Sequence, residues 1–112
     1  MWDFDIRIGS IKAAVLLGCL AGPAAGKDFT AGVVVEEMSP ADQYTFVSGI
    51  VEGLATARMI ADDGDTKARG CIYHWFYEGE NAMNNVLAAF AYFPDKLPGR
   101  VVHAMTVKEC GE

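Results

Sequence analysis

Three features of the sequence predict a small all-α domain of four helices, tied by one disulfide and preceded by a cleaved signal peptide. Residues 1–26 have the zones of an export signal. The chain after them keeps two cysteines, Cys71 and Cys110. Apolar residues recur at helical spacing between proline and glycine breaks. We therefore divide the chain into a signal peptide (1–26), an irregular N-terminal segment (27–38) and a helical domain (39–112).

The signal-peptide prediction depends on positive charge, an apolar run and small residues, in that order. Arg7 and Lys12 supply the charge, and the apolar run extends from 13 to 21. Residues 24–26 are the small residues that a signal peptidase needs. The run is shorter than the ~20 residues of a membrane-spanning helix, and no second one follows it. The sequence therefore predicts a periplasmic or secreted protein with no membrane span.

Cys19 offers an alternative form of export. Residues 16–19 (LLGC) are similar to a lipoprotein box, in which Cys19 would be acylated. Ordinary cleavage discards Cys19 instead and leaves an even number of cysteines. Because the exterior of the cell is oxidising, Cys71 and Cys110 are then expected to form a disulfide.

The helix boundaries are predicted from caps and periodicity. Ser39 and Pro40 provide a hydroxyl cap and a proline at the first helical position. The apolar run at 71–78 is interpreted as a helix, although its periodicity alone also allows a buried strand. Pro94 ends the third helix, and Gly111 ends the last one. The predicted helices span 40–60, 71–78, 81–93 and 98–110.

The first predicted helix carries small residues four apart, at Gly49, Gly53 and Ala57. Each interior glycine costs about 1 kcal/mol in helix propensity. We therefore expect another helix to pack closely along this small-residue groove, which would offset that cost.

The sequence contains no motif that predicts catalysis. It has no nucleophile elbow, no zinc-protease motif and no glycine-rich phosphate loop. His74 and His103 could join Cys71 and Cys110 around zinc, but the spacing is irregular and the cysteines are expected to pair. We therefore predict no enzymatic activity, no cofactor and no metal site.

The charge of the chain limits the partners that it can bind. The net charge is −6, and removing residues 1–26 leaves it unchanged because that segment has two charges of each sign. An acidic surface repels phosphate backbones and anionic lipid. The sequence therefore predicts a protein partner rather than a nucleic acid, and it leaves a homodimer open.

Two groups of residues are candidates for contact with that partner. Asp62, Asp63 and Asp65 form an acidic turn, which is too short for a calcium loop and lacks its distal glutamate. Tyr73 and Tyr77 fall on the opposite side of their helix from Trp75, and tyrosine is enriched at protein interfaces.

The order of several motifs resembles the Rap/Tai-type immunity proteins, which are similar in size and layout to the HdeA-like periplasmic acid chaperones. Immunity proteins of this type bind type VI secreted peptidoglycan amidases and block their active sites. The resemblance covers residues 39–110 and implies a small disulfide-bonded helical inhibitor of a cell-wall amidase. It is carried by Tyr44-x-x-Val47-x-Gly49-x-Val51-Glu52-Gly53-Leu54, Cys71, Phe93-Pro94 and Cys110.

Two other functions are alternatives to the inhibitor. The HdeA-like layout implies an acid-stress chaperone. Acid would neutralise the carboxylates, leave the Lys, Arg and His side chains positive, and loosen a marginal core by repulsion. The remaining alternative is an envelope protein without a single partner.

Overall fold

The computed structural model describes residues 29–112, and over this range the fold is all-α, as the sequence predicts. This range holds five α-helices, one more than expected, and a π-helix that continues α4. The predicted signal peptide (1–26) and the lipidation alternative at Cys19 lie outside the described residues. No helix within 29–112 is long and apolar enough to cross a bilayer. The elements are α2 (Ala31–Glu37), α3 (Pro40–Ala61), α4 (Lys67–Tyr73), η1 (His74–Glu78), α5 (Ala82–Tyr92) and α6 (Pro98–Cys110).

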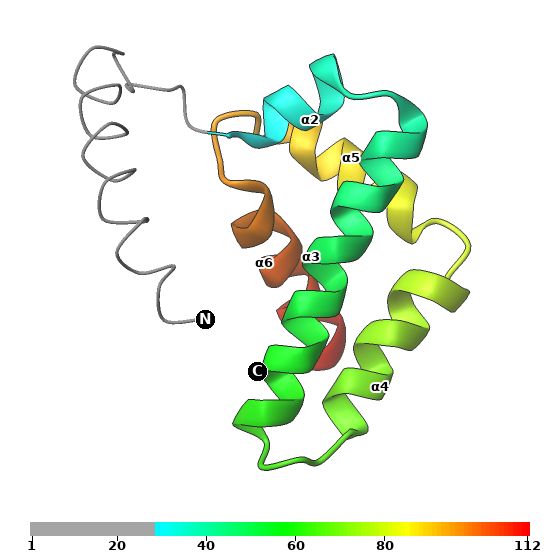
Figure 1. Cartoon of the computed structure of the whole chain (residues 1–112), viewed down its shortest axis with the longest axis vertical. Helices are drawn as coiled ribbons and strands as arrows, with labels where there is room; N and C mark the ends of the chain where they lie inside the picture. Colours follow the sequence, from blue (N-terminus) through cyan, green and yellow to red (C-terminus); the bar gives the residue numbers. More distant parts are fainter. Residues whose placement is uncertain (1–28) are drawn as a thin grey trace, which may run out of the picture.

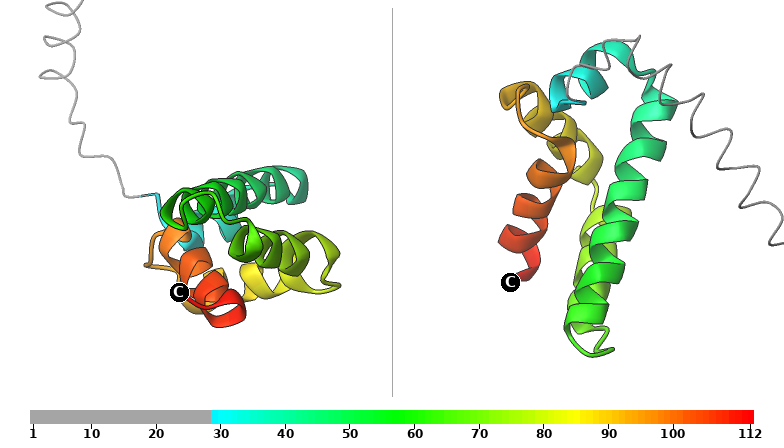
Figure 2. Two further views of the ribbon diagram at one scale, coloured as in Figure 1. Left: turned by 90° about the horizontal axis from the view of Figure 1, so that it is seen from below. Right: turned by 60° about the vertical axis from the view of Figure 1, so that its left-hand side comes forward.

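The helices surround a common interior. The longest helix, α3, forms one side of the molecule, and α4 with η1 returns antiparallel along it (Figure 1). The last helix, α6, packs against both α3 and α4, and α5 packs against η1 and α6 (Figure 2). The short helix α2 lies across the end where α3 begins and contacts α5 and α6.

The predicted boundaries of α3 are confirmed to within one residue. The Oγ of Ser39 accepts a hydrogen bond from the backbone N–H of Asp42 at 3.2 Å, and Pro40 occupies the first helical position. This cap satisfies one of the free N–H groups of the first turn. At the other end, Asp63 and Gly64 adopt positive φ values of 56° and 90°, which stop the helix.

The second predicted helix exists, but it begins four residues before the expected start at 71. α4 starts at Lys67, whose backbone N–H donates to the Asp65 carboxylate at 2.9 Å. Its first turn contains Lys67, Ala68, Arg69 and Gly70, of which only Ala68 is buried, so apolar periodicity does not indicate it. The helical geometry of 67–78 also rules out the strand alternative for this segment.

The prediction of an irregular segment at 27–38 is wrong for residues 31–37, which form α2. Its first N–H groups donate to loop carbonyls, from Ala31 to Lys96 at 2.8 Å and from Gly32 to Pro94 at 3.0 Å. At its C-terminal end, the Gln43 side chain donates to the carbonyl of Val34 at 3.1 Å. Partners far along the chain therefore complete this helix, and no local cap predicts it.

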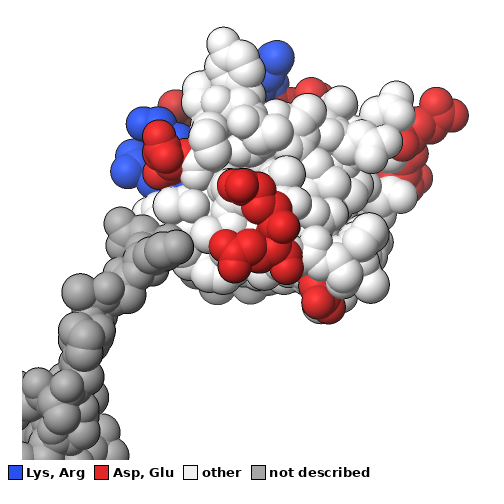
Figure 3. Space-filling model, turned by 90° about the horizontal axis from the view of Figure 1, so that it is seen from above, with Lys and Arg blue, Asp and Glu red and all other residues white. Residues whose placement is uncertain are grey.

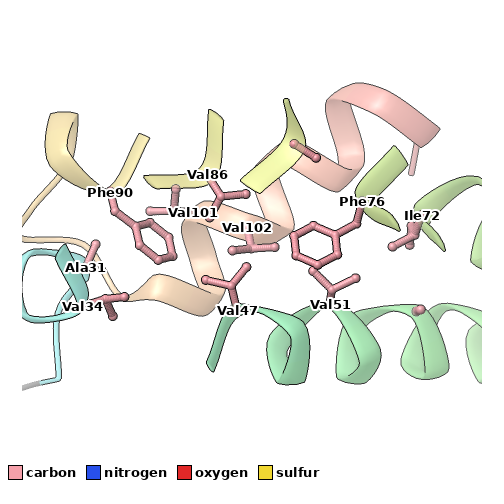
Figure 4. Packing of buried hydrophobic residues seen from close by; sticks show 12 residues of the cluster. Ala31, Val34, Val47, Val51, Ile72, Phe76, Val86, Phe90, Val101 and Val102 are labelled. Atoms are coloured by element: carbon pink, nitrogen blue, oxygen red, sulfur yellow. The ribbon is translucent and has the colours of Figure 1, made fainter. Parts of the chain in front are cut away.

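A single cluster of buried side chains fills the interior. Val47 and Val51 of α3 face Phe76 of η1, and Phe90 of α5 lies beside Val34 of α2 (Figure 4). The disulfide between Cys71 and Cys110 ties α4 to the end of α6, as predicted, with their Cα atoms 5.8 Å apart. The cluster contains Ala31, Val34, Val47, Val51, Ala55, Ile72, Phe76, Ala82, Val86, Phe90, Val101 and Val102.

The prediction that another helix packs along Gly49, Gly53 and Ala57 is wrong for the described part of the chain. All three residues are exposed, and a Cβ atom built at either glycine would meet nothing within 4 Å. The apolar stripe of Val47, Val51 and Ala55 faces the core instead, which turns the glycines to the outer side of α3.

We expect Gly49→Ala to stabilise the protein by about 0.5–1 kcal/mol, because alanine is the better helix former and the added methyl group meets no neighbour. Urea unfolding measures this change. Gly79→Ala is the contrasting variant, since its Cβ atom would clash with the carbonyl oxygen of Trp75, and we expect it to destabilise the fold. A loss of stability in Gly49→Ala would show that a helix does pack on this side of α3.

Candidate functional site

A group of polar and aromatic side chains bridges α3 and the α4–η1 helix at the surface. We call it the tyrosine face and define it as Tyr44 and Glu52 of α3 with Arg69, Tyr73 and Tyr77 of α4–η1. On each helix these residues are spaced by four or eight positions, so each set forms one line. The structure thus brings together Tyr73 and Tyr77, the pair that the sequence predicts for partner contact, and adds three residues to them.

Glu52 joins the two helices of the tyrosine face. The Tyr73 hydroxyl donates to Glu52 Oε1 at 2.6 Å, and the Tyr77 hydroxyl donates to Glu52 Oε2 at 2.7 Å. Both bonds involve a charged acceptor, which makes them shorter and stronger than bonds between neutral groups. One carboxylate therefore fixes the orientation of two tyrosine side chains.

Arg69 holds Tyr73 from the other side. Its Cζ lies 4.5 Å from the centroid of the Tyr73 ring, and its Nη2 donates to the Tyr73 hydroxyl at 3.4 Å. A guanidinium above an aromatic face is attracted by the ring quadrupole. The Tyr73 ring is therefore held by a cation on its face and an anion at its hydroxyl.

Phe76 anchors the outer tyrosines to the core. This side chain is buried, and its ring stacks on Tyr44 with centroids 6.1 Å apart. Tyr77 meets the same ring edge-on at 5.0 Å. Tyr44 and Tyr77 remain 49% and 43% exposed. The tyrosine face thus presents fixed aromatic surface to solvent.

The π-helical segment η1 explains why one run of aromatics reaches both core and surface. Residues 74–78 bond in the i→i+5 pattern, which widens the helix locally. Phe76 is buried, Trp75 is half-buried and Tyr77 is exposed on this single turn. Short π segments are frequent at functional sites.

The Glu52 hydrogen bonds shift the pKa values of both Glu52 and Tyr77. The bonds from Tyr73 and then Tyr77 lower the pKa of Glu52 from 4.5. Partial burial of Tyr77 and its bond to Glu52 raise the pKa of Tyr77 from 10.0 to about 12. The Glu52 contribution to stability is present above pH 4.5 and is lost as the pH falls through its lowered pKa. The Tyr77 contribution is present below pH 10 and is lost as the pH rises towards 12.

We expect one tyrosine to ionise at a pH of about 12 instead of 10.0, because partial burial and then the hydrogen bond to the Glu52 carboxylate raise the pKa of Tyr77. Ultraviolet absorbance during an alkaline titration measures this step. In Tyr77→Phe the late step should vanish, and in Glu52→Gln it should move towards pH 10. If every tyrosine of the wild-type protein ionises near pH 10, the hydrogen bond to Glu52 is not formed in solution.

The acidic turn lies apart from the tyrosine face. Asp62 follows the last residue of α3 and is ten residues beyond Glu52, a separation of about 15 Å along the helix axis. Its carboxylate pairs with Arg58 at 3.1 Å, and the Arg58 guanidinium also donates to the carbonyl of Gly111 at 2.7 Å. Asp63 and Asp65 are exposed, and Asp65 receives the Lys67 N–H described above. Two of the three predicted aspartates therefore hold the α3–α4 turn and the chain end in place.

The histidines and cysteines do not form a metal site in the described structure. Both cysteines are bonded to each other, which removes them as ligands. His74 lies 3.4 Å from the carboxylate of Glu78, four residues along, on the surface of η1, and His103 lies on α6. Within residues 29–112 no three His, Cys, Asp or Glu side chains are close enough to hold a metal ion.

Three members of the tyrosine face are not among the site residues predicted from the sequence: Tyr44, Glu52 and Arg69. Glu52 is the one carboxylate in a stretch of apolar and small residues (47–57), and it follows Tyr44 by eight residues. That placement on one helical line was a usable signal. The pairing of Glu52 with Tyr73 and Tyr77 depends on how α3 meets η1, which one-dimensional spacing does not give.

No protein-family model, no curated protein sequence and no solved structure matches the chain. The Rap/Tai-type resemblance and the HdeA-like alternative therefore stay predictions from sequence.

Proposed function

We propose that this chain is an exported helical binding protein whose tyrosine face docks on a protein partner, and that the partner is a peptidoglycan amidase which it inhibits. The resemblance to the Rap/Tai-type immunity proteins supplies the class of partner. The fixed, exposed tyrosines supply the surface. The predicted signal peptide would deliver the chain to the periplasm, the compartment where such an amidase acts.

The observation that carries the proposal is the preorganisation of Tyr73 and Tyr77 by Glu52. Tyrosine is enriched among the few residues that contribute most to an interface. Ordering a flexible side chain costs about 0.5–1.5 kcal/mol on binding. Because these two hydroxyls are already bonded at 2.6 and 2.7 Å, most of that cost has been met in the free protein.

The charges and exposed rings of the tyrosine face indicate what kind of partner surface would match it. Its two ionised residues, Glu52 and Arg69, are oriented by contacts within the face, and both remain near the surface. Tyr44 and Tyr77 lie around them with about half of their surface exposed. A partner surface with an apolar centre and a polar edge matches this pattern, which is the usual anatomy of a protein interface.

We expect the purified chain to abolish the activity of one secreted peptidoglycan amidase from its own organism, at about one chain per enzyme. The assay measures the release of peptides from purified cell wall while the chain is titrated into each amidase. A lysozyme-type hydrolase, which cuts the sugar backbone, is the control enzyme and should keep its activity. If every amidase remains fully active at a large excess of the chain, the inhibitor proposal is wrong.

A further inference from the structure

The groove between α5 and α6 combines an apolar interior with cationic edges. Its volume is ≈ 470 Å³, which lies within the ordinary range of small-molecule pockets. It is lined by Ala89 of α5 and Phe93, which follows that helix, and by Val101 and Met105 of α6. None of its lining residues is a carboxylate.

Three cations border this groove, which we call the basic groove: Lys96, Arg100 and Lys108. Arg100 and Lys108 lie on one line of α6 with Ala104 between them, because each step is four residues. The line extends for eight residues, or about 12 Å. Lys96 adds a third positive charge just before α6 begins.

This concentration of positive charge is unusual in a chain of net charge −6. Residues 29–112 contain six Lys and Arg side chains, of which three border the basic groove. Arg58 pairs with Asp62 and Arg69 lies over Tyr73, so both have a partner inside the fold. The ion pairs of the described chain include none of the three groove cations. Acidic side chains predominate on the end of the molecule that carries α2 (Figure 3).

The apolar part of the basic groove is also uncovered. Phe93 lines the groove and is 45% exposed. Leu97, next to Lys96, is 48% exposed. Large apolar side chains beside unpaired cations form a surface that suits a molecule with an apolar body and a negative end.

We propose that the basic groove binds a free straight-chain carboxylic acid. The alkyl chain lies against Phe93, Val101 and Met105, and the carboxylate is held by Lys108 and Arg100 at the edge. The groove spans about two turns of α6, which is too short for a peptide helix of three or more turns. The proposal is independent of the tyrosine face, which lies on α3 and η1.

Calorimetric titration of the purified chain with laurate, kept below the concentration at which it forms micelles, tests this site. We expect saturable binding of one laurate per chain. Dodecyltrimethylammonium, which has the same tail and a positive head, should bind at least tenfold more weakly. A second titration, with vesicles of phosphatidylglycerol, measures binding to an anionic membrane surface and so distinguishes it from binding of a free acid.

Variants at the groove separate the role of its charge from that of its shape. Lys108→Gln should weaken laurate binding about fivefold, the effect of one surface charge pair. Lys67→Gln removes the same charge on α4, away from the groove, and should leave the affinity unchanged. Ala104→Phe changes an exposed residue and fills the groove, so it should abolish binding while all cations remain.

Three results would overturn the proposal. The first is no binding of laurate up to its micelle concentration. The second is equal binding of laurate and dodecyltrimethylammonium, with Lys108→Gln behaving like the wild type, since the cations would then play no part. The third is binding to the vesicles alone, which would make this groove a membrane-contact surface.

Discussion

We expect the double variant Cys71→Ser/Cys110→Ser to lose about 4 kcal/mol of unfolding free energy. The disulfide closes a loop with a sequence separation of 39 residues, and the chain-entropy model gives this value for such a loop. Small domains have only 5–15 kcal/mol in total, and a chain of this size buries a modest core. Since α4 and α6 both contribute to that core, separating them affects the whole domain. The melting temperature should fall by roughly 15–30 °C.

Urea unfolding of the oxidised protein, the reduced protein and the double variant measures this loss. The reduced wild-type protein should behave like the double variant, and a reductant should leave the variant unchanged. A double variant that stays within about 1 kcal/mol of the oxidised protein would show that the bond contributes little to the fold.

Phe90→Ala should be the most damaging single substitution in the core, with a loss of about 3–5 kcal/mol. The Phe90 side chain is fully buried. It lies in one cluster with Val34 of α2 and Val101 of α6 (Figure 4). Alanine leaves a cavity there that the surrounding helices fill only in part. Chemical denaturation reports the change as a lower midpoint with a similar slope.

Tyr92→Ala is the matched control for Phe90→Ala, because it removes an aromatic ring from the same helix. Tyr92 is 78% exposed and contacts the neighbouring Phe93 ring. We expect a change within about 0.5 kcal/mol for this variant. If the two substitutions cost the same, Phe90 is not at the centre of the core.

The sequence was sufficient to predict the all-α class, the disulfide and most helix ends because each has a local signal. Ser39 and Pro40 begin α3, Pro98 begins α6, and Gly111 follows its last residue. A hydroxyl cap, a proline at the first helical position and a glycine after the end all act within a few residues. Such features are visible without any knowledge of the tertiary structure.

The helix α2 could not be predicted because its stability comes from distant partners. Its seven residues contain three consecutive valines, which favour extended structure, and no side-chain cap. Loop carbonyls at Pro94 and Lys96 accept its first N–H groups. The backbone of Gly32 approaches Pro94 so closely that a Cβ atom there would lie 3.1 Å from the proline Cβ. Burial of Val34 then outweighs the local preference for an extended chain.

The tyrosine face was predicted in part. The four-residue spacing of Tyr73 and Tyr77 and their position opposite Trp75 placed both tyrosines on one side of a helix. The role of Glu52 depends on the register between α3 and the α4–η1 helix, which brings its carboxylate within 2.6 and 2.7 Å of the two hydroxyls. The small residues on α3 predicted close packing at Gly49, because glycines inside helices usually have a packing reason. In the structure nothing lies within 4 Å of a Cβ atom built at Gly49.

The most direct test of the proposed function is the affinity of the inhibited amidase for Tyr73→Ser/Tyr77→Ser, measured by calorimetry beside Tyr92→Ser. Truncation of an interface hot spot costs at least about 2 kcal/mol, or about thirtyfold in affinity. We predict a loss of this size or more for the double variant and wild-type affinity for Tyr92→Ser, whose ring lies on α5. Equal affinity of the wild-type protein and the double variant would contradict the assignment of the tyrosine face as the binding surface.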